Sequence, residues 1–430
     1  MQFPKISEYV KASQDASDNL GMSTKATIAE FNESIMDEFG VKYSKDGRKL
    51  LKAPQNLDGT YSIKEGVRII CNNAFWGCCS LTDIVIPDSV TSIGDKAFYR
   101  CSSLTSFVIP NGVTRIGTWT FLGCSSLKEV AIPDSVTSIG DGAFASCLSL
   151  SNIVIPDGVT SIGDGAFWNC SSFLIKYISI PKSVICLNGN PFVKWEGKLE
   201  CLSPNFIYED DVLFNKDKSK IISFRNKAVK SYIIPSSVTS IGNSAFAGCT
   251  SLSNIAIPSS VNSIGDKAFW DCCSLNSIAI PDSVTSIGDG AFCGCKSLRS
   301  IVIPDGVTSI GCGAFAYCKS LKSLVLHDSV TYIGNEAFHG CESLSSLVIP
   351  DSVTRIRDSA FSGCASLSSL VIPDSVMSIG DSAFSGCTSL SSLVIPDSVM
   401  SIGYSAFCGC NIPTDLKQEL ISRFGRKIFG

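Results

Sequence analysis

The sequence contains very little histidine and comparatively little charge. It has two histidines in 430 residues, and 17% of its residues are charged, whereas soluble domains average about 25%. The 35 basic and 39 acidic residues leave a net charge of −4, and the pI is near 5.4. This balance argues against a nucleic-acid binder, which would normally show a basic surface and a high pI.

Long apolar runs are also missing. There is no stretch of 18 apolar residues, so we predict no transmembrane segment. The first residues, MQFPKISEYVKASQDASDNL, contain no apolar signal-peptide core. The absence of a leader favours a cytoplasmic location.

Enzyme signatures are absent too. The sequence has no G-x-S-x-G, no P-loop and no H-E-x-x-H motif. Its many serines and aspartates recur at regular intervals, whereas a catalytic constellation is a singular arrangement. We therefore expect no catalytic residue, no cofactor and no enzymatic activity.

The dominant feature that is present is a repeat marked by phenylalanine. Phe75 and Phe407 lie 332 residues apart, which corresponds to fourteen periods of 23 residues plus ten inserted residues. A fixed period in this range predicts a solenoid, here of about fifteen turns, one of which has its phenylalanine disguised. The column phenylalanines are Phe75, Phe98, Phe121, Phe144, Phe167, Phe192, Phe246, Phe269, Phe292, Phe315, Phe338, Phe361, Phe384 and Phe407.

A single turn, residues 88–110, reads DSVTSIGDKAFYRCSSLTSFVIP. Its Leu-x-x-Phe-x-Ile segment alternates like a strand with one buried face, and a second short strand is expected at Val-Thr-Ser-Ile. The Ala-Phe-x-x-Cys spacing suits a helical or 3₁₀ turn. With strands about 4.8 Å apart, fifteen turns would make a rod roughly 70 Å long.

Two further columns have readable roles. Glycine recurs two residues before each Lys/Gly/Ser-Ala-Phe, as at Gly94 and Gly311, and we expect a positive φ there. The Pro-Asp-Ser or Pro-Asp-Gly that follows each strand is a turn sequence, in which Pro presets φ and Asp is expected to bond to nearby backbone.

These residues carry a family resemblance. The turn C-x-S-L-x-S-I-x-I-P-D-S-V-T-S-I-G-D-x-A-F resembles the BspA-like (treponemal-type) leucine-rich repeat over about residues 61–413. The resemblance implies a strand-rich α/β, right-handed leucine-rich-repeat solenoid with short helical turns. It also implies a binding role, often as a cell-surface adhesin.

The remaining segments predict caps and one interruption. We expect an N-terminal cap over residues 1–60, repeats over 61–192 and 235–413, and a C-terminal helical cap over 414–430. In the first cap, residues 24–39 place Ile28, Phe31, Ile35 and Phe39 on one helical stripe, followed by a hairpin around Asp46-Gly47.

The second cap and the interruption have their own patterns. At the C-terminal end, Asp415 is expected to N-cap a helix with Gln418, and Gly425 to end it. That helix buries Leu416, Leu420 and Phe424. Residues 193–234 interrupt the array, and we predict that segments 206–214 and 220–224 form a hairpin projecting from the rod.

The 21 cysteines have three interpretations. Thirteen of them form one column, and free cysteine packs well as a small buried hydrophobe. Neighbouring column members are close enough for a disulfide framework, and close pairs such as Cys293-x-Cys295 allow a zinc site, although none has C-x₂-C spacing. Buried reduced thiols are favoured, and no metal site is assigned.

Calcium is a further alternative. The Pro-Asp column (Asp88, Asp134, Asp157, Asp282, Asp305, Asp328, Asp351, Asp374 and Asp397) would attract a hard cation. Turn chemistry explains the same residues without one.

Two exposed columns are candidates for binding. The strands carry a small apolar stripe: Val85, Val108, Ala131, Val154, Ala256, Ala279, Val302, Val325, Val348, Val371 and Val394. The residue after each phenylalanine varies more, and its aromatic and imidazole members are candidate partner-binding residues: Trp76, Tyr99, Trp168, Trp270 and His339. In the alternative interpretation this column tolerates any residue, or its rings pack over adjoining turns.

We therefore expect a non-enzymatic protein that presents a long repeat surface to a protein or glycan partner. An adhesin at the cell surface follows from the resemblance. An intracellular scaffold follows from the missing signal and the thiols, and a cation-dependent binding module is the alternative class.

Overall fold

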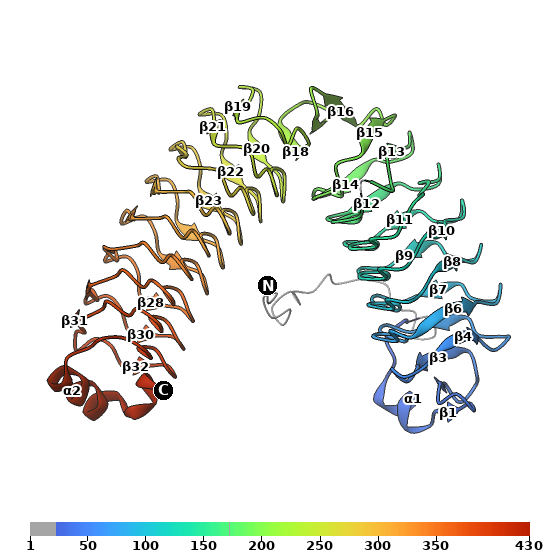
Figure 1. The fold of residues 1–430 in the computed structure, drawn as a ribbon, viewed down its shortest axis with the longest axis horizontal. Helices are drawn as coiled ribbons and strands as arrows, with labels where there is room; N and C mark the ends of the chain where they lie inside the picture. Colours follow the sequence, from blue (N-terminus) through green and yellow to red (C-terminus); the bar gives the residue numbers. More distant parts are fainter. Residues whose placement is uncertain (1–22, 172) are drawn as a thin grey trace.

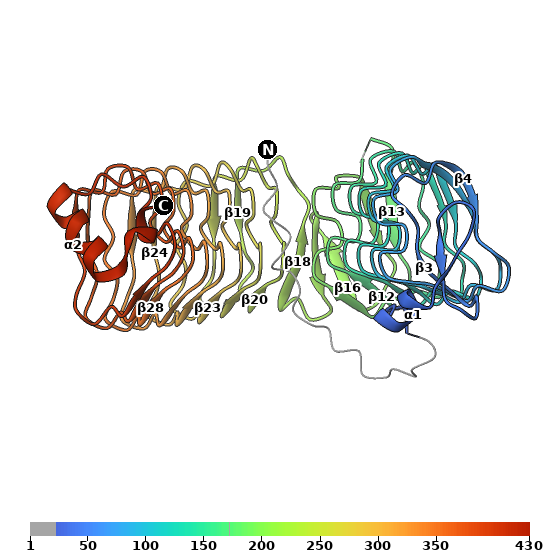
Figure 2. The same ribbon diagram turned by 90° about the horizontal axis from the view of Figure 1, so that it is seen from below.

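The chain forms a curved stack of turns. The computed structural model describes residues 23–171 and 173–430, and these make a strand-rich solenoid of about fifteen turns of 23 residues, as predicted (Figures 1 and 2). The stack differs from the predicted rod in that it bends into an arch (Figure 1). Helices α1 (Ile28–Asn32) and α2 (Thr414–Phe424) lie at its two feet (Figure 1).

Each regular turn contributes up to two short strands, at the two places that the sequence predicts. The Val-x-x-Ile strands form an inner ladder, closer to the hollow of the arch (Figure 1). They are β5 (Ile69–Ile70), β7 (Ser92–Ile93), β9 (Arg115–Ile116), β11 (Ser138–Ile139), β12 (Ser161–Gly163), β14 (Cys186–Asn188), β20 (Ser240–Ile241), β22 (Ser263–Ile264), β23 (Ser286–Ile287), β25 (Ser309–Ile310), β27 (Tyr332–Ile333), β28 (Arg355–Ile356), β30 (Ser378–Ile379) and β32 (Ser401–Ile402).

The strands before each proline form an outer ladder. They are β4 (Gly59–Ser62), β6 (Leu81–Val85), β8 (Ser106–Val108), β10 (Glu129–Ala131), β13 (Tyr177–Ile180), β15 (Lys198–Cys201), β19 (Ser231–Ile233), β21 (Asn254–Ala256), β24 (Ser300–Val302), β26 (Ser323–Val325), β29 (Ser369–Val371) and β31 (Ser392–Val394). Neighbouring strands are parallel within both ladders of the repeats, as in the pairs β8–β10 and β11–β12.

The two ladders differ in continuity, and this difference matches the curvature. The outer strands pair only two at a time, whereas the inner strands join into longer sheets, one of which has eight strands including the insertion. Hydrogen-bonded strands lie about 4.8 Å apart. The inner side therefore keeps the shorter spacing, and the outer side opens at intervals.

A column of phenylalanine rings runs through the core. Consecutive rings are nearly parallel with centroids 5.0–6.0 Å apart in both blocks, which is offset stacking. The disguised member is Phe224, whose ring lies 4.9 Å from that of Phe246. Burial of each such ring stabilises the fold by about 1.5–3 kcal/mol.

Backbone hydrogen bonds lock the loops that carry these rings. We call the segment from the column glycine to the column cysteine of each turn the phenylalanine loop. Alternate N–H groups of each loop donate to the next turn. Thus Phe98 donates to the oxygen of Thr120 at 3.0 Å and Phe361 to that of Ala383 at 2.8 Å. The N–H of Cys101 bonds back to Phe98 at 3.2 Å, which is the expected 3₁₀-type turn.

The role predicted for the column glycines is wrong. Gly94 and Gly311 do not have a positive φ. They are required because a Cβ would collide with the preceding turn: at Gly311 it would lie 2.6 Å from the nitrogen of Asp289 and 2.6 Å from the carbonyl carbon of Gly288. The constraint is close approach of two backbones rather than an unusual dihedral angle.

The aspartate that bonds to backbone is also not the predicted one. Among the described residues, the Pro-Asp column makes no hydrogen bond to its own turn, which is closed instead by bonds such as Val90 N–H to Pro87 at 3.0 Å. In most turns an aspartate follows the column glycine, and its carboxylate bonds to the backbone of the next turn. The Oδ1 of Asp141 accepts from the N–H of Asp164 at 2.9 Å, and Asp164 accepts from Asn190 at 2.8 Å.

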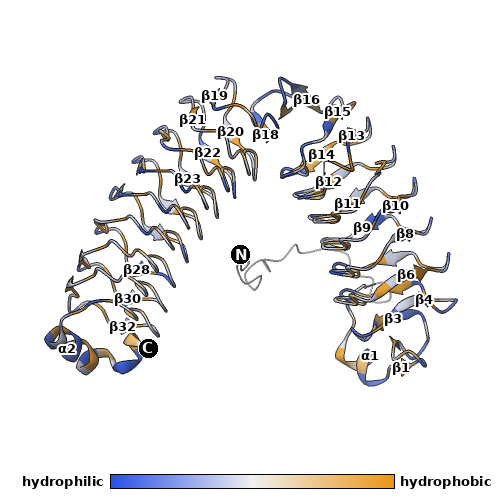
Figure 3. Cartoon of the chain, in the orientation of Figure 1, coloured by the Kyte–Doolittle hydropathy of each residue, from blue (hydrophilic) through white to orange (hydrophobic). Residues whose placement is uncertain are grey.

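The N-terminal cap is only partly the predicted one. The hairpin is confirmed as β2 (Lys42–Tyr43) and β3 (Lys49–Lys52). The helix over 24–39 is wrong: α1 is five residues long, and Ile35 lies in β1 (Ile35–Met36), which pairs with β2. Short helices are marginal alone, and here strand pairing extends the inner sheet instead. The four residues predicted to form a buried stripe, Ile28, Phe31, Ile35 and Phe39, are exposed. The apolar part of α1 is orange in Figure 3.

The C-terminal cap has the expected buried face. Leu420 is buried, Leu416 and Phe424 pack on the core, and α2 ends before Gly425. A 3₁₀ helix, η2 (Arg426–Phe429), follows. The predicted capping box is wrong, because Pro413 is the N-cap and Asp415 lies inside the first turn. Its carboxylate there complements the helix dipole.

The predicted hairpin is present, since residues 212–214 pair antiparallel with 221–224, but it is built into the inner sheet instead of projecting from the stack. Residues 206–224 form a meander of β16 (Phe206–Glu209), β17 (Val212–Asn215) and β18 (Lys220–Phe224), and β18 continues in parallel into β20. Asp210 and Asp211, both with positive φ, break the predicted 206–214 strand.

This meander divides the hydrophobic core. Successive side chains on its strands face opposite ways: Val212 and Ile221 join the core of the C-terminal block, while Leu213 and Ile222 join that of the N-terminal block. It is therefore a partition sheet between two repeat blocks.

The close approach at the column glycine predicts a sharp difference between two neighbouring positions. Gly311→Ala should lower the free energy of unfolding by roughly 3 kcal/mol, because backbone must move. At Gly313 there is room for a Cβ, and the only cost is that alanine must adopt φ +59°. Gly313→Ala should therefore lower the free energy of unfolding by about 1 kcal/mol. Urea unfolding followed by circular dichroism measures both, and equal losses would contradict the steric role.

The ladder aspartates predict a pH effect. Burial raises the pKa of Asp164 to about 6 from 3.8. A raised pKa stabilises the fold below the unfolded value, and that contribution is lost as pH rises through 6. Asp164→Asn keeps the acceptor without the charge, so we expect it to stabilise the protein by about 2 kcal/mol at pH 8 and to have little effect near pH 4.

The exposed turn variant Asp88→Asn serves as the control for Asp164→Asn. Urea unfolding at both pH values reports the result, and no gain for Asp164→Asn at pH 8 would refute the burial cost.

Candidate functional site

The five residues predicted from the variable column do not form one site. Trp76 is 43% exposed, and Lys52 lies 5.4 Å from its ring centroid. Tyr99 is only 6% exposed, so the expectation of an exposed anchor fails for this ring. His339 is half-buried and packs edge-on against Tyr317 at 5.0 Å.

Trp168 and Trp270 are brought together although 102 residues separate them. Their ring centroids are 6.2 Å apart, with planes inclined at 59°. Both indoles are half-buried. Here the rings pack over adjoining turns, as the alternative interpretation of the column holds.

This indole pair belongs to the joint between the two blocks. The Lys194 ammonium lies 4.2 Å from the Trp270 centroid and 3.0 Å from the carboxylate of Asp271. Asn190 donates to the carbonyl of Ser244 at 2.8 Å across the same joint. The cluster therefore holds the end of the first block against the start of the second.

The apolar stripe is exposed as predicted, and it lies on the outer ladder. In the C-terminal block five successive turns contribute valines that are 47–74% exposed. Serines border this valine stripe on the strands, as in Ser369–Val371 and Ser392–Val394. We use the name valine stripe for Val302, Val325, Val348, Val371 and Val394.

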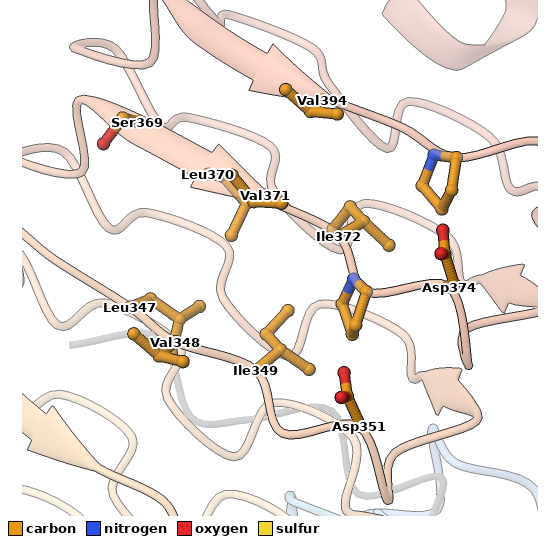
Figure 4. A pocket seen from close by; sticks show the side chains of 12 residues that line it. Leu347, Val348, Ile349, Asp351, Ser369, Leu370, Val371, Ile372, Asp374 and Val394 are labelled. Atoms are coloured by element: carbon orange, nitrogen blue, oxygen red, sulfur yellow. The ribbon is translucent and has the colours of Figure 1, made fainter.

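A hollow of about 500 Å³ opens along the stripe, between turns whose outer strands are not paired. Figure 4 shows Val348 and Val371 on neighbouring turns at this hollow, with Val394 on the turn beyond. Ile349 and Ile372 line it further along the chain, toward the Pro-Asp turns. Since β29 pairs with β31 but not with residues 345–349, backbone as well as side chains borders the hollow.

The cysteine column is part of the core. All 21 cysteines fall in the described part of the chain and are free thiols. In eleven of the thirteen column members Sγ donates to the carbonyl of the phenylalanine in the preceding turn at 3.1–3.5 Å, as from Cys124 to Phe98. Burial raises the pKa of Cys124 to about 12, which keeps it a protonated donor.

The zinc and calcium interpretations have no matching group of side chains in the described residues. Within residues 23–171 and 173–430, no three His, Cys, Asp or Glu side chains are grouped so that they could hold a metal ion. His327, in a proline position, contacts a single carboxylate, that of Asp305, at 2.8 Å. In the same part of the chain no helix is long and apolar enough to cross a bilayer.

Sequence reasoning passed over one exposed group. In the last two turns methionines replace the threonine that precedes the inner strand: Met377 and Met400 are exposed, as is Tyr404, four residues after Met400. The replacement of threonine by a large apolar residue in two successive turns was the available signal.

The chain is similar to known leucine-rich repeat proteins in sequence and in structure. The profile of the BspA type leucine rich repeat region matches residues 60–196, 220–325 and 308–430. A leucine-rich repeat protein from Eubacterium ventriosum is 29% identical, with a TM-score of 0.59 over 74% of this chain and 84% of that one. A leucine rich cell surface protein from Faecalibacterium prausnitzii is also 29% identical, with a TM-score of 0.55 over 78% and 93%. No curated protein matches the chain.

The indole cluster predicts that its two tryptophans act on stability. Trp270→Ala should lower the free energy of unfolding by roughly 2–4 kcal/mol, because the ring covers the joint. Trp168→Ala should have a similar effect, and the double variant should lose less than the sum, since the rings share one contact. Trp76→Ala, at an exposed ring, is the matched control and should cost under about 1 kcal/mol. Equal losses at all three positions would exclude a special role for the joint.

Proposed function

Because the chain belongs to the BspA-type leucine-rich repeat family, we propose that it is a binding protein whose valine stripe docks another protein. The family match spans most of the chain. The observation that supports this surface is the row of exposed valines in five successive turns, with the hollow between Val348 and Val371.

Physical chemistry favours this surface. Contiguous exposed apolar patches on soluble proteins often mark interaction sites, and burial yields about 25 cal/mol per Å². The stripe lies on a rigid stack, so little conformational entropy is lost when a partner binds. Its serine borders can supply the hydrogen bonds of a polar rim.

A protein partner suits the stripe better than a glycan. Valines offer no hydrogen bond and no aromatic face to a sugar ring, whereas apolar side chains of a protein fill hollows between them. Of the five variable-column residues, only Trp76 has a substantially exposed ring and remains a candidate contact for either partner class.

Two cellular settings remain for this activity. The relative from Faecalibacterium prausnitzii is described as a cell surface protein, which supports an adhesin. The free cysteines support an intracellular scaffold. Fractionation of the native cells distinguishes these settings.

A binding screen tests the proposed surface. The purified full chain is applied to a protein array and to a glycan array, and hits are titrated by surface plasmon resonance. We expect protein hits whose affinity falls at least tenfold in Val348→Asp/Val371→Asp, because two charges then face the apolar partner.

The matched control is Val85→Asp/Val108→Asp, which alters the same column in the N-terminal block. It should retain affinity. Hits on glycans alone, or equal losses in both double variants, would refute docking at the valine stripe.

A further inference from the structure

Two members of the cysteine column do not donate to a phenylalanine carbonyl. Cys78 donates to the carbonyl of Pro54 instead, and Cys249 lies beside a lysine. Counting three residues on from each column phenylalanine gives the column position, which is Cys170 after Phe167 and Cys249 after Phe246. In the disguised turn, three residues after Phe224 is Lys227. A lysine therefore replaces a cysteine in the turn immediately before Cys249.

This replacement changes the hydrogen bonds of Cys249. In a regular turn the thiol would donate to the carbonyl of the preceding phenylalanine, here Phe224. That carbonyl instead accepts from the Lys227 ammonium at 3.2 Å, and the same ammonium bonds to the carbonyl of Ala247 at 3.0 Å. The Nζ of Lys227 also lies 3.2 Å from the Sγ of Cys249.

The geometry therefore favours a thiolate at this one position. The Lys227 ammonium bonds to the Phe224 carbonyl, which would otherwise accept the thiol proton of Cys249. The same ammonium places a positive charge next to the sulfur. Burial raises the pKa of Cys249, but the charge of Lys227 and its hydrogen bond to the sulfur oppose burial, and the net shift is downward. The negative charge of Glu196 opposes this downward shift. For Cys272 burial raises the pKa well above the usual value.

We propose that Cys249 is a peroxide-sensitive thiol activated by Lys227, with Cys272 of the next turn as the thiol that resolves it. Thiolates paired with a lysine are the form that reacts with peroxides. The two cysteines occupy the same position in adjacent turns, so their backbones lie within the separation that a disulfide spans.

The chemistry takes place in two balanced steps. The Cys249 thiolate attacks one oxygen of hydrogen peroxide: an S–O bond forms, the O–O bond breaks, and the departing hydroxide takes a proton to become water. Cys249 is thereby oxidised by two electrons to the sulfenic acid. The Cys272 sulfur then attacks that sulfur, an S–S bond forms, and the hydroxyl leaves as water with the Cys272 proton.

The burial of Cys249 limits the size of the oxidant that could react with it. Cys249 is 1% exposed, while Lys227 beside it is half-buried. Peroxide is close to water in size, so we expect reaction with hydrogen peroxide and little reaction of the folded chain with bulky maleimides.

Disulfide mapping of the full chain tests the proposal. The reduced protein is treated with hydrogen peroxide at pH 7, unfolded in N-ethylmaleimide, digested and analysed by mass spectrometry. We expect the Cys249–Cys272 link to form at least tenfold faster than a Cys318–Cys341 link. That pair occupies the same column positions in adjacent turns, and its thiols donate to Phe292 and Phe315.

Two further measurements decide the role of Lys227. In Lys227→Met the rate should fall at least tenfold while circular dichroism confirms folding. A second measurement uses the unaltered chain. The rate at which the Cys249–Cys272 link forms should reach its plateau at a pH below the usual pKa range of thiols. Equal rates for the two cysteine pairs, or a rate in the folded Lys227→Met protein that matches the unaltered chain, would overturn the proposal.

Discussion

The register between successive turns is the constraint on which this structure depends. Each phenylalanine loop donates N–H groups to the next turn at 2.6–3.0 Å, and the rings stack in the same register. Because backbones come so close, the column glycine admits no side chain. The same contact brings the column cysteine under the carbonyl of the preceding phenylalanine, so one spacing explains three columns at once.

The partition sheet shows how the chain tolerates an interruption of that register. The meander of β16, β17 and β18 gives one face to each block, and β18 restores the inner ladder by pairing with β20. The joint is then closed on the loop side by Lys194 with Asp271 and by the two indoles. Lys227, which departs from the cysteine column, also lies at this joint.

Much of the fold could be predicted because each buried position recurs in many turns of the sequence. The two strands per turn, the phenylalanine column and the buried face of α2 follow from side-chain periodicity alone. The roles of Gly311 and Asp141 could not be predicted that way, since they depend on how closely neighbouring turns approach. The N-terminal helix failed because the stripe at Ile28 and Phe31 competes with strand pairing at Ile35, and pattern alone does not decide between them.

The candidate binding surfaces show the same limit. The valine stripe was visible as a column, but its hollow depends on the open outer ladder, which reflects curvature of the whole arch. Trp168 and Trp270 looked like equivalents of Trp76. Their contact across the joint depends on the insertion between them, whose path the sequence did not reveal.

The direction of the loop hydrogen bonds gives the two ends of the arch different chemistry. Every phenylalanine loop donates toward the C-terminus and accepts from the N-terminal side. The first full turn is therefore closed by donors, Ala53 N–H on Ala74 and the Lys52 ammonium on Asn73, while the last is closed by acceptors, with Phe407 donating to Ile428. The solenoid therefore has a direction. Whole turns could be added or removed between its ends, but neither cap could serve at the opposite end.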